Sequence, residues 1–139
     1  MSRNSLDTLK RFRRTLCEDA RKALEACQEA EEAAGMVLHR AEAAIMSEQV
    51  AAMAPDAPDG AVESFVAWLP HGRQAVSRAR EAQESAVAAT VQARAVLASA
   101  RASAEAVEKL IEERAAAQKR HGLKAEQAEL DELARRPAL

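Results

Sequence analysis

The segment Ala54-Pro55-Asp56-Ala57-Pro58-Asp59-Gly60 decides the fold of this chain, because two of its four prolines stand there beside a glycine. Proline has no backbone N–H and disfavours helix in the residue before it, and Asp-Gly is a common turn sequence. The flanking segments are long, rich in alanine and heavily charged, which favours helix. We therefore predict two helices that are joined by a turn at 53–60 and pack as an antiparallel hairpin.

The composition indicates a coiled coil and not a broad globular core. Aromatic residues make up 2% of the 139 residues, and alanine supplies much of the 48% that is hydrophobic. Charged residues reach 30%, yet the net charge is only −2, which disfavours general binding of nucleic acid. We predict an all-α protein in which residues 1–139 form a single coiled-coil domain.

The segment before the turn carries apolar side chains at alternating spacings of three and four residues. This is the heptad pattern of a coiled coil, and it predicts a helix over about 5–52. The interface positions are Leu6, Leu9, Arg13, Leu16, Ala20, Ala23, Cys27, Ala30, Ala34, Val37, Ala41, Ala44 and Glu48. One flank adds Cys17, Leu24, Leu38 and Ile45, so the apolar stripe is three positions wide.

The segment after the turn continues the same alternation. Its interface positions are Val62, Phe65, Leu69, Gly72, Val76, Ala79, Gln83, Ala86, Thr90, Ala93, Leu97, Ala100, Ala104, Val107 and Ile111, with Trp68, Val96 and Leu110 on one flank. Pro70 and Gly72 stand early in this segment and predict either a short helix or a kink over 61–72. The long helix is then expected over about 73–135.

Alanine at so many interface positions limits the stability of the hairpin. At about 25 cal/mol per Å² of buried apolar area, alanine contributes much less than leucine. We expect the hairpin to be completed by a partner or by weak self-association, so interaction is a better hypothesis than catalysis.

The sequence contains no recognisable catalytic or metal-binding motif. It has no glycine-rich phosphate loop, no Gly-x-Ser-x-Gly, no His-Glu-x-x-His and no Cys-x-x-Cys. Cys17 and Cys27 lie ten residues apart, roughly 15 Å along a helix, which is too far for a disulfide. We expect no enzymatic activity, no cofactor and no metal. With no apolar run long enough to insert into a membrane, we expect the protein to be cytoplasmic.

Basic residues gather near both ends of the predicted hairpin. Lys10, Arg13 and Arg14 stand early in the first helix, and Lys119 and Arg120 stand late in the second. In an antiparallel hairpin residue 6 is expected opposite about residue 119, so both groups meet at the open end. Residues from about 122 onward extend past the first helix and offer Leu130 and Leu133 to a partner. The alternative is an ordinary charged surface of a coiled coil.

Several short motifs resemble the flagellar export protein FliJ family, which is related to the YscO-type stalk proteins of virulence secretion systems. They are Leu6-x-x-Leu9 followed by Arg13, the break near the middle, and the ending Glu126-x-x-Glu129-Leu130-Asp131-Glu132-Leu133-Ala134. The resemblance implies an antiparallel coiled coil that inserts into the ring of an export ATPase. It also implies contacts with the export gate and with export chaperones, at the cytoplasmic side of the inner membrane. The basic residues and the two leucines named above are then the expected ATPase-binding residues.

The resemblance also implies a gate-binding pattern, Phe-x-x-x-Leu-x-x-Ala-x-x-x-polar, at the start of the second helix. Phe65 and Leu69 match it, whereas Gly72 and Val76 depart from it; Trp68 lies between the matching residues. Phe65, Trp68, Leu69 and Val76 are therefore the expected gate-binding residues. In the alternative interpretation, the aromatic residues only close the end of the hairpin.

Two further classes of function remain open from the sequence. One is a structural or oligomerising coiled coil without an ATPase partner. The other is a holdase-like chaperone, for which only Phe65 and Trp68 provide an apolar tip. Neither explains the basic residues at the open end.

Overall fold

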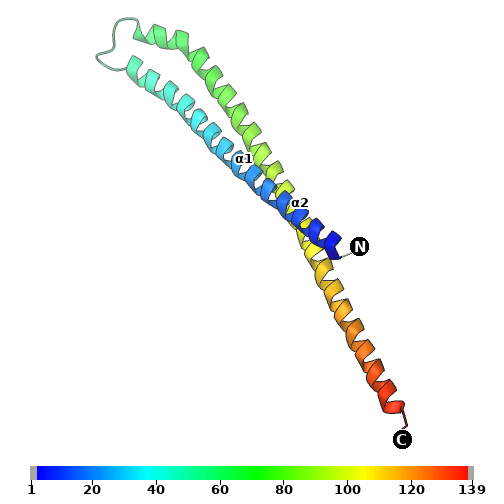
Figure 1. The fold of residues 1–139 in the computed structure, drawn as a ribbon. Helices are drawn as coiled ribbons and strands as arrows, with labels where there is room; N and C mark the ends of the chain where they lie inside the picture. Colours follow the sequence, from blue (N-terminus) through cyan, green and yellow to red (C-terminus); the bar gives the residue numbers. More distant parts are fainter. Residues whose placement is uncertain (1–2, 138–139) are drawn as a thin grey trace. The chain divides into compact units, whose positions relative to one another are not determined.

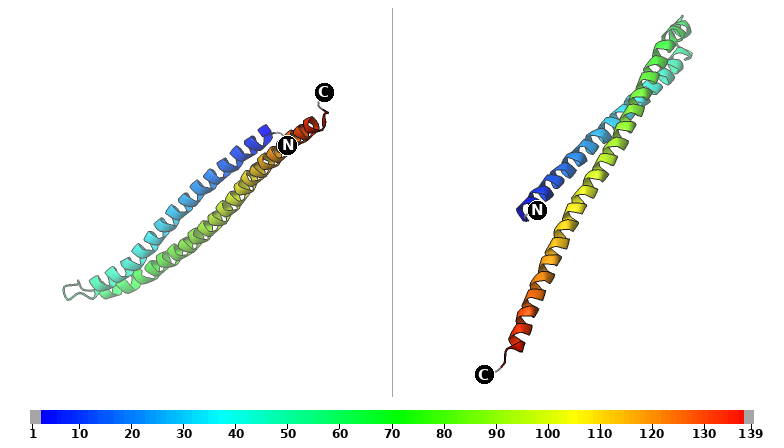
Figure 2. Two further views of the ribbon diagram at one scale, coloured as in Figure 1. Left: turned by 90° about the horizontal axis from the view of Figure 1, so that it is seen from below. Right: turned by 90° about the vertical axis from the view of Figure 1, so that its right-hand side faces the viewer.

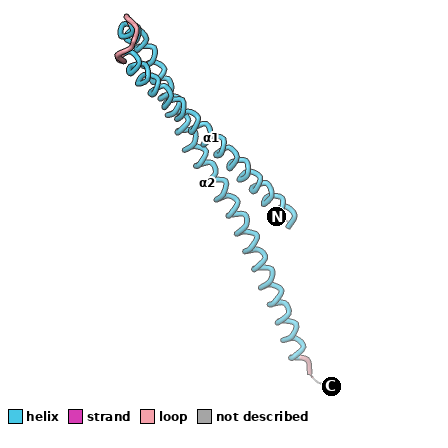
Figure 3. Tube along the Cα trace, turned by 90° about the vertical axis from the view of Figure 1, so that its left-hand side faces the viewer, coloured by secondary structure: helices cyan, strands magenta, loops and turns pink. Residues whose placement is uncertain are grey.

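The computed structural model describes residues 3–137 and contains two α-helices, α1 (Arg3–Ala52) and α2 (Ala61–Arg135). They run antiparallel and are joined by residues 53–60 (Figure 1, Figure 3). The described residues contain no β-strand. The predicted all-α antiparallel hairpin is therefore confirmed.

The loop at 53–60 forms where proline and glycine predicted it. The Ala57 N–H donates to the Ala54 carbonyl at 3.0 Å, and the Ala61 N–H donates to the Pro58 carbonyl at 3.1 Å. Gly60 has a φ of 83°, a left-handed conformation that costs glycine little. Its carbonyl then accepts the Ser64 N–H at 3.0 Å, so helical bonding begins directly after the glycine.

Pro70 lies inside α2 and does not end it. The helix is continuous from Ala61, so residues 61–72 form its first turns and not a separate short helix. Figure 1 shows these turns running in a different direction from the rest of α2. Proline removes one hydrogen bond of the helix and crowds the preceding turn, which accounts for a bend at this place.

Contacts divide the chain into two compact units. One unit consists of residues 19–97, which include the loop, and the other combines residues 1–18 with residues 98–139. Within each unit, a segment of α1 packs along a segment of α2.

The interface of α1 in the 19–97 unit differs from the predicted one at every second position. Ala20 is buried and Cys27, Ala34 and Ala41 are half-buried, as predicted. The other positions are taken by Leu24, Leu38 and Ile45 from the flank and by the half-buried Glu31, while the predicted Ala23, Ala30, Val37 and Ala44 are exposed. A three-residue stripe allows two interfaces, and the observed one buries larger side chains and so more apolar area.

The interface of α2 follows the predicted positions closely. Gly72, Ala79, Thr90 and Leu97 are buried, and most intervening positions are half-buried; Val62 is the exception, with 49% exposure. Thr90 is the most deeply buried side chain, with 1% exposure. Its hydroxyl lies 3.2 Å from the Cys27 carbonyl of α1 and 3.1 Å from the Ala86 carbonyl of its own helix. A threonine that reaches the backbone of the facing helix requires the two helices to approach closely.

In the other unit, the interface has two buried apolar side chains among the described residues. Leu6 is 5% exposed and Val107 is 8% exposed. The described residues of α2 after Ile111 are all exposed, and Figure 2 shows α2 continuing past the first turns of α1. The part of α2 beyond Lys119 is therefore a single helix with no packed face.

Gly72 is buried because the indole of Trp68 covers it. A Cβ atom at Gly72 would lie 2.7 Å from Cη2 and 2.9 Å from Cζ3 of Trp68. The position therefore needs a residue without a side chain, one turn after the tryptophan. This packing explains why residue 72 is glycine, although the gate-binding pattern has alanine at that position.

Replacing Thr90 with leucine should lower the free energy of unfolding by about 1–3 kcal/mol, because added methylenes do not fit between closely spaced helices. Leucine favours helix more than threonine does and is the usual residue of wider coiled coils. These two properties alone would predict that the Thr90→Leu variant is more stable. Urea unfolding followed by circular dichroism measures the change. Ala88→Leu, at an exposed position of the same helix, is the control and should have an effect within about 0.5 kcal/mol. A more stable Thr90→Leu variant would contradict the close approach.

Replacing Gly72 with alanine should displace the indole of Trp68 and shift its emission to longer wavelength. Because Trp68 is the single tryptophan of the chain, its fluorescence reports on this contact alone. Gly122→Ala is the control, since a Cβ there meets nothing within 4 Å. The control should keep the emission unchanged, and alanine at either position should preserve the helical circular dichroism. Unchanged emission of Gly72→Ala would show that the indole does not depend on the glycine.

Candidate functional site

The described residues form open surface hollows that are candidate binding sites. No group of three or more His, Cys, Asp or Glu side chains within residues 3–137 is placed to hold a metal ion. Cys17 and Cys27 are free, half-buried thiols. The candidate sites are therefore the open end, the start of α2 and the hollows beside them.

Arg13 and Lys10 lie partly in the helix interface of the open end. Both are half-buried. The Arg13 Nε is buried and has no hydrogen-bond acceptor among the described residues. The guanidinium carbon lies 5.9 Å from the centroid of the Phe12 ring, within the range of a cation–π contact. Arg13 thus contributes less accessible charge to this end than its neighbour Arg14.

Arg14 is exposed and forms an ion pair across the unit. Its Nη2 lies 3.6 Å from Oε1 of Glu108 in α2, and the two side chains are 60% and 43% exposed. An exposed pair of this kind contributes at most about 1 kcal/mol. Arg14 therefore stays available for exchange to a carboxylate of a partner.

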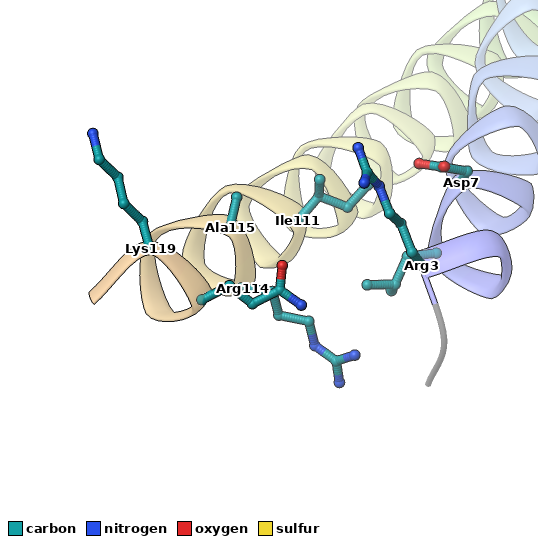
Figure 4. Close-up of a pocket in the computed structure, with 8 residues that line it drawn as sticks. Arg3, Asp7, Ile111, Arg114, Ala115 and Lys119 are labelled. Carbon is teal, nitrogen blue, oxygen red and sulfur yellow. The ribbon is translucent and has the colours of Figure 1, made fainter. Parts of the chain in front are cut away.

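A hollow opens between the first turns of α1 and the segment 111–119 of α2. We call it the N-terminal hollow; its lining residues are Arg3, Leu6 and Asp7 from α1 and Ile111, Arg114, Ala115, Gln118 and Lys119 from α2. In Figure 4, Arg3 reaches from α1 toward α2, whereas Arg114 and Lys119 extend from α2 in different directions. Lys119 therefore lies near the start of α1, as predicted, and Arg3 adds a cation that the sequence interpretation missed. Leu6 shares the hollow with Ile111, Arg114, Ala115, Gln118 and Lys119, of which Lys119 is the last along α2.

Arg120, Leu130 and Leu133 lie on the single-helix part of α2. All three are exposed, the two leucines by 59% and 60%. Leu123, exposed by 56%, stands seven residues before Leu130 and lies on the same side of the helix. The predicted ATPase-binding residues thus divide into three groups. Lys10, Arg13 and Arg14 lie on α1, Lys119 lines the N-terminal hollow, and Arg120, Leu130 and Leu133 lie beyond the hollow on α2.

The four predicted gate-binding residues are all half-buried. The rings of Phe65 and Trp68 lie 6.2 Å apart with an interplanar angle of 33°. Both rings line a hollow with Ala52, Gly60 and Ala61 at the end of the hairpin. These side chains therefore pack the tip and keep an accessible edge, which is compatible with both interpretations from the sequence.

A second surface near the loop was not recognised from the sequence. Met46, Val50 and Met53 are 64%, 68% and 69% exposed. They line a shallow groove with Gln49, Ala54 and Pro55, which we call the α1 groove. The spacing of four and three residues between these side chains is a signal of a helical face, but this face is offset from the heptad interface.

Neither helix has an apolar stretch sufficient to cross a membrane, as judged over the residues that the structure describes.

The family comparison gives one match, and it covers nearly the entire chain. The family model described as "Flagellar FliJ protein" matches residues 2–139. Neither the curated proteins nor the solved structures contain a significant match. With two antiparallel helices, a central proline-glycine loop and a family match of this extent, the chain belongs to the FliJ family of flagellar export proteins.

Proposed function

We propose that this protein is a non-enzymatic stalk of the flagellar export apparatus that binds the ring of the export ATPase and promotes its assembly and turnover. The observation that carries the proposal is the single-helix part of α2, whose leucines are exposed directly beyond a group of accessible cations. A helix with no packed face in the isolated chain is suited to bury that face in a partner. Membership of the FliJ family supports a role in flagellar export.

Stimulation of an ATPase in this way requires no catalytic residue in the stalk. One antiparallel coiled coil at the centre of a six-membered ring contacts each subunit differently. Contact free energy then favours ring assembly and biases successive nucleotide states, because a ligand shifts an equilibrium by its differential affinity for the states. The alanine-rich interface lets the two helices adjust against such a partner at low cost.

The exposure of each basic side chain indicates which cations can contact a partner. Arg14, Lys119 and Arg120 are exposed, whereas Arg13 and Lys10 are half-buried. We therefore assign the first three to contact with acidic or polar groups of the ATPase, and Arg13 to support within the interface. Leu130 and Leu133 supply the apolar part of the contact.

The start of α2 is the proposed contact with the export gate, through Phe65, Trp68, Leu69 and Val76. Their partly accessible edges support the assignment. Export chaperones are a further proposed class of partner, and a position at the cytoplasmic side of the inner membrane follows from contact with the gate.

Reversing the charge of Arg14, Lys119 and Arg120 to glutamate should abolish stimulation of the cognate export ATPase. Residual binding should depend less on salt, because exposed charge pairs are screened over about 8 Å at physiological ionic strength. ATP turnover at increasing stalk concentration measures the effect. The control variant carries Arg21→Glu, Arg40→Glu and Arg94→Glu, three exposed positions in the 19–97 unit with the same total change of charge. Turnover that saturating wild-type protein leaves unchanged would remove the ATPase proposal and leave a structural coiled coil.

Replacing Phe65 and Leu69 with alanine should weaken binding to a cytoplasmic fragment of the export gate by about tenfold or more, as expected for apolar anchors of an interface. Val66→Ala is the control, because Val66 is 60% exposed beside the same residues. Calorimetry measures binding, and circular dichroism checks the helices. If the helical signal falls together with binding, the two side chains close the hairpin and the gate assignment fails.

A further inference from the structure

The α1 groove is an apolar face that the helix interface leaves uncovered. Met46, Val50 and Met53 follow one another at spacings of four and three residues, so Met46 and Val50 lie on one side of α1 and Met53 continues that side into the loop. The interface side of the same turns is formed by the half-buried Ile45 and the buried Ala52. Three large apolar side chains that are each about two-thirds exposed are costly to hydrate together, which marks the groove as a place for a partner.

The segment of sequence that contains the α1 groove, between Arg40 and Arg73, carries negative charge only. From Ala41 to Gly72 the chain has five acidic residues and no lysine or arginine. Glu42 is paired with Arg80 at 3.7 Å. The other four, Glu48, Asp56, Asp59 and Glu63, are exposed and lie on the last turns of α1, the loop and the first turn of α2. The chain as a whole has a net charge of only −2, so this segregation is a local property of the tip.

We propose that the α1 groove binds an amphipathic helix of a partner protein, with leucine-type side chains in the groove and lysine or arginine side chains toward the four acidic residues. An apolar stripe at helical spacing is complementary to the stripe of a second helix. Methionine adapts its shape to the side chains it meets. Opposite charge around the groove selects basic helices and excludes acidic ones.

A second copy of this chain is a poor occupant of the α1 groove. Pairing two copies through the same face would bring two acidic tips together without a counter-charge. Three apolar side chains also fall well short of the roughly 800 Å² per partner of a stable interface. The groove is lined by α1 and the loop and shares no residue with the proposed gate contact on α2, so substitutions of its apolar residues test it separately.

The test uses the full chain and a designed helical peptide as the probe. The peptide carries leucines along one face and lysines along the other, and two matched peptides replace the lysines with glutamates or scramble the leucine spacing. Calorimetry should detect binding of the leucine-lysine peptide only. Val50→Ser with Met53→Ser should weaken it by about tenfold, since most of the apolar burial is lost. Val87→Ser with Val91→Ser, which alters two exposed valines of α2 outside the groove, should leave the affinity unchanged.

A second variant tests the charges. Glu48→Gln, Asp56→Asn and Asp59→Asn together should weaken binding of the leucine-lysine peptide and remove most of its dependence on salt. Equal affinity for the glutamate peptide, or equal loss in the Val87/Val91 control, would overturn the proposal. Sedimentation that shows wild-type self-association, abolished by Val50→Ser with Met53→Ser, would overturn it in favour of a second copy.

Discussion

The close approach of α1 and α2 at Thr90 is the constraint on which the 19–97 unit depends. Its hydroxyl meets the backbone carbonyl of Cys27 in the facing helix, and alanines occupy much of the interface around it. A small, polar and fully buried residue at the contact fixes which residues face each other but contributes little apolar area. The specific alignment and the low stability expected from the sequence therefore have the same cause.

The parts of the fold that depend on backbone chemistry were predictable from the sequence, and those that depend on side-chain size were not. The prolines and Gly60 located the loop, and the three-four spacing located the α2 interface. On α1 the apolar stripe was three positions wide, and Leu24, Leu38 and Ile45 prevailed over alanines because they are larger. The indole of Trp68 over Gly72 could not be read from spacing alone, since it depends on a side-chain conformation.

The candidate sites show the same limit. Arg13 and Arg14 are neighbours in the sequence and were assigned one role, but consecutive residues point about 100° apart on a helix. Arg13 consequently enters the interface, while Arg14 reaches Glu108 at the surface. The exposure of Leu130 and Leu133 was predicted correctly, because it followed from the difference in length of the two helices. The length of each helix could be predicted from the sequence, whereas the direction of a charged side chain depends on which face of its helix is buried.

A protein that acts without catalytic groups must act through free energy of contact, and its weak interface determines where that free energy is available. Large apolar side chains remain exposed in both units, Leu123, Leu130 and Leu133 in one and Met46, Val50 and Met53 in the other. A near-zero net charge conceals an uneven distribution, because residues 41–72 hold five acidic side chains and no lysine or arginine. The two exposed apolar surfaces share no residue, so substitutions in one surface test its proposed contact without altering the other.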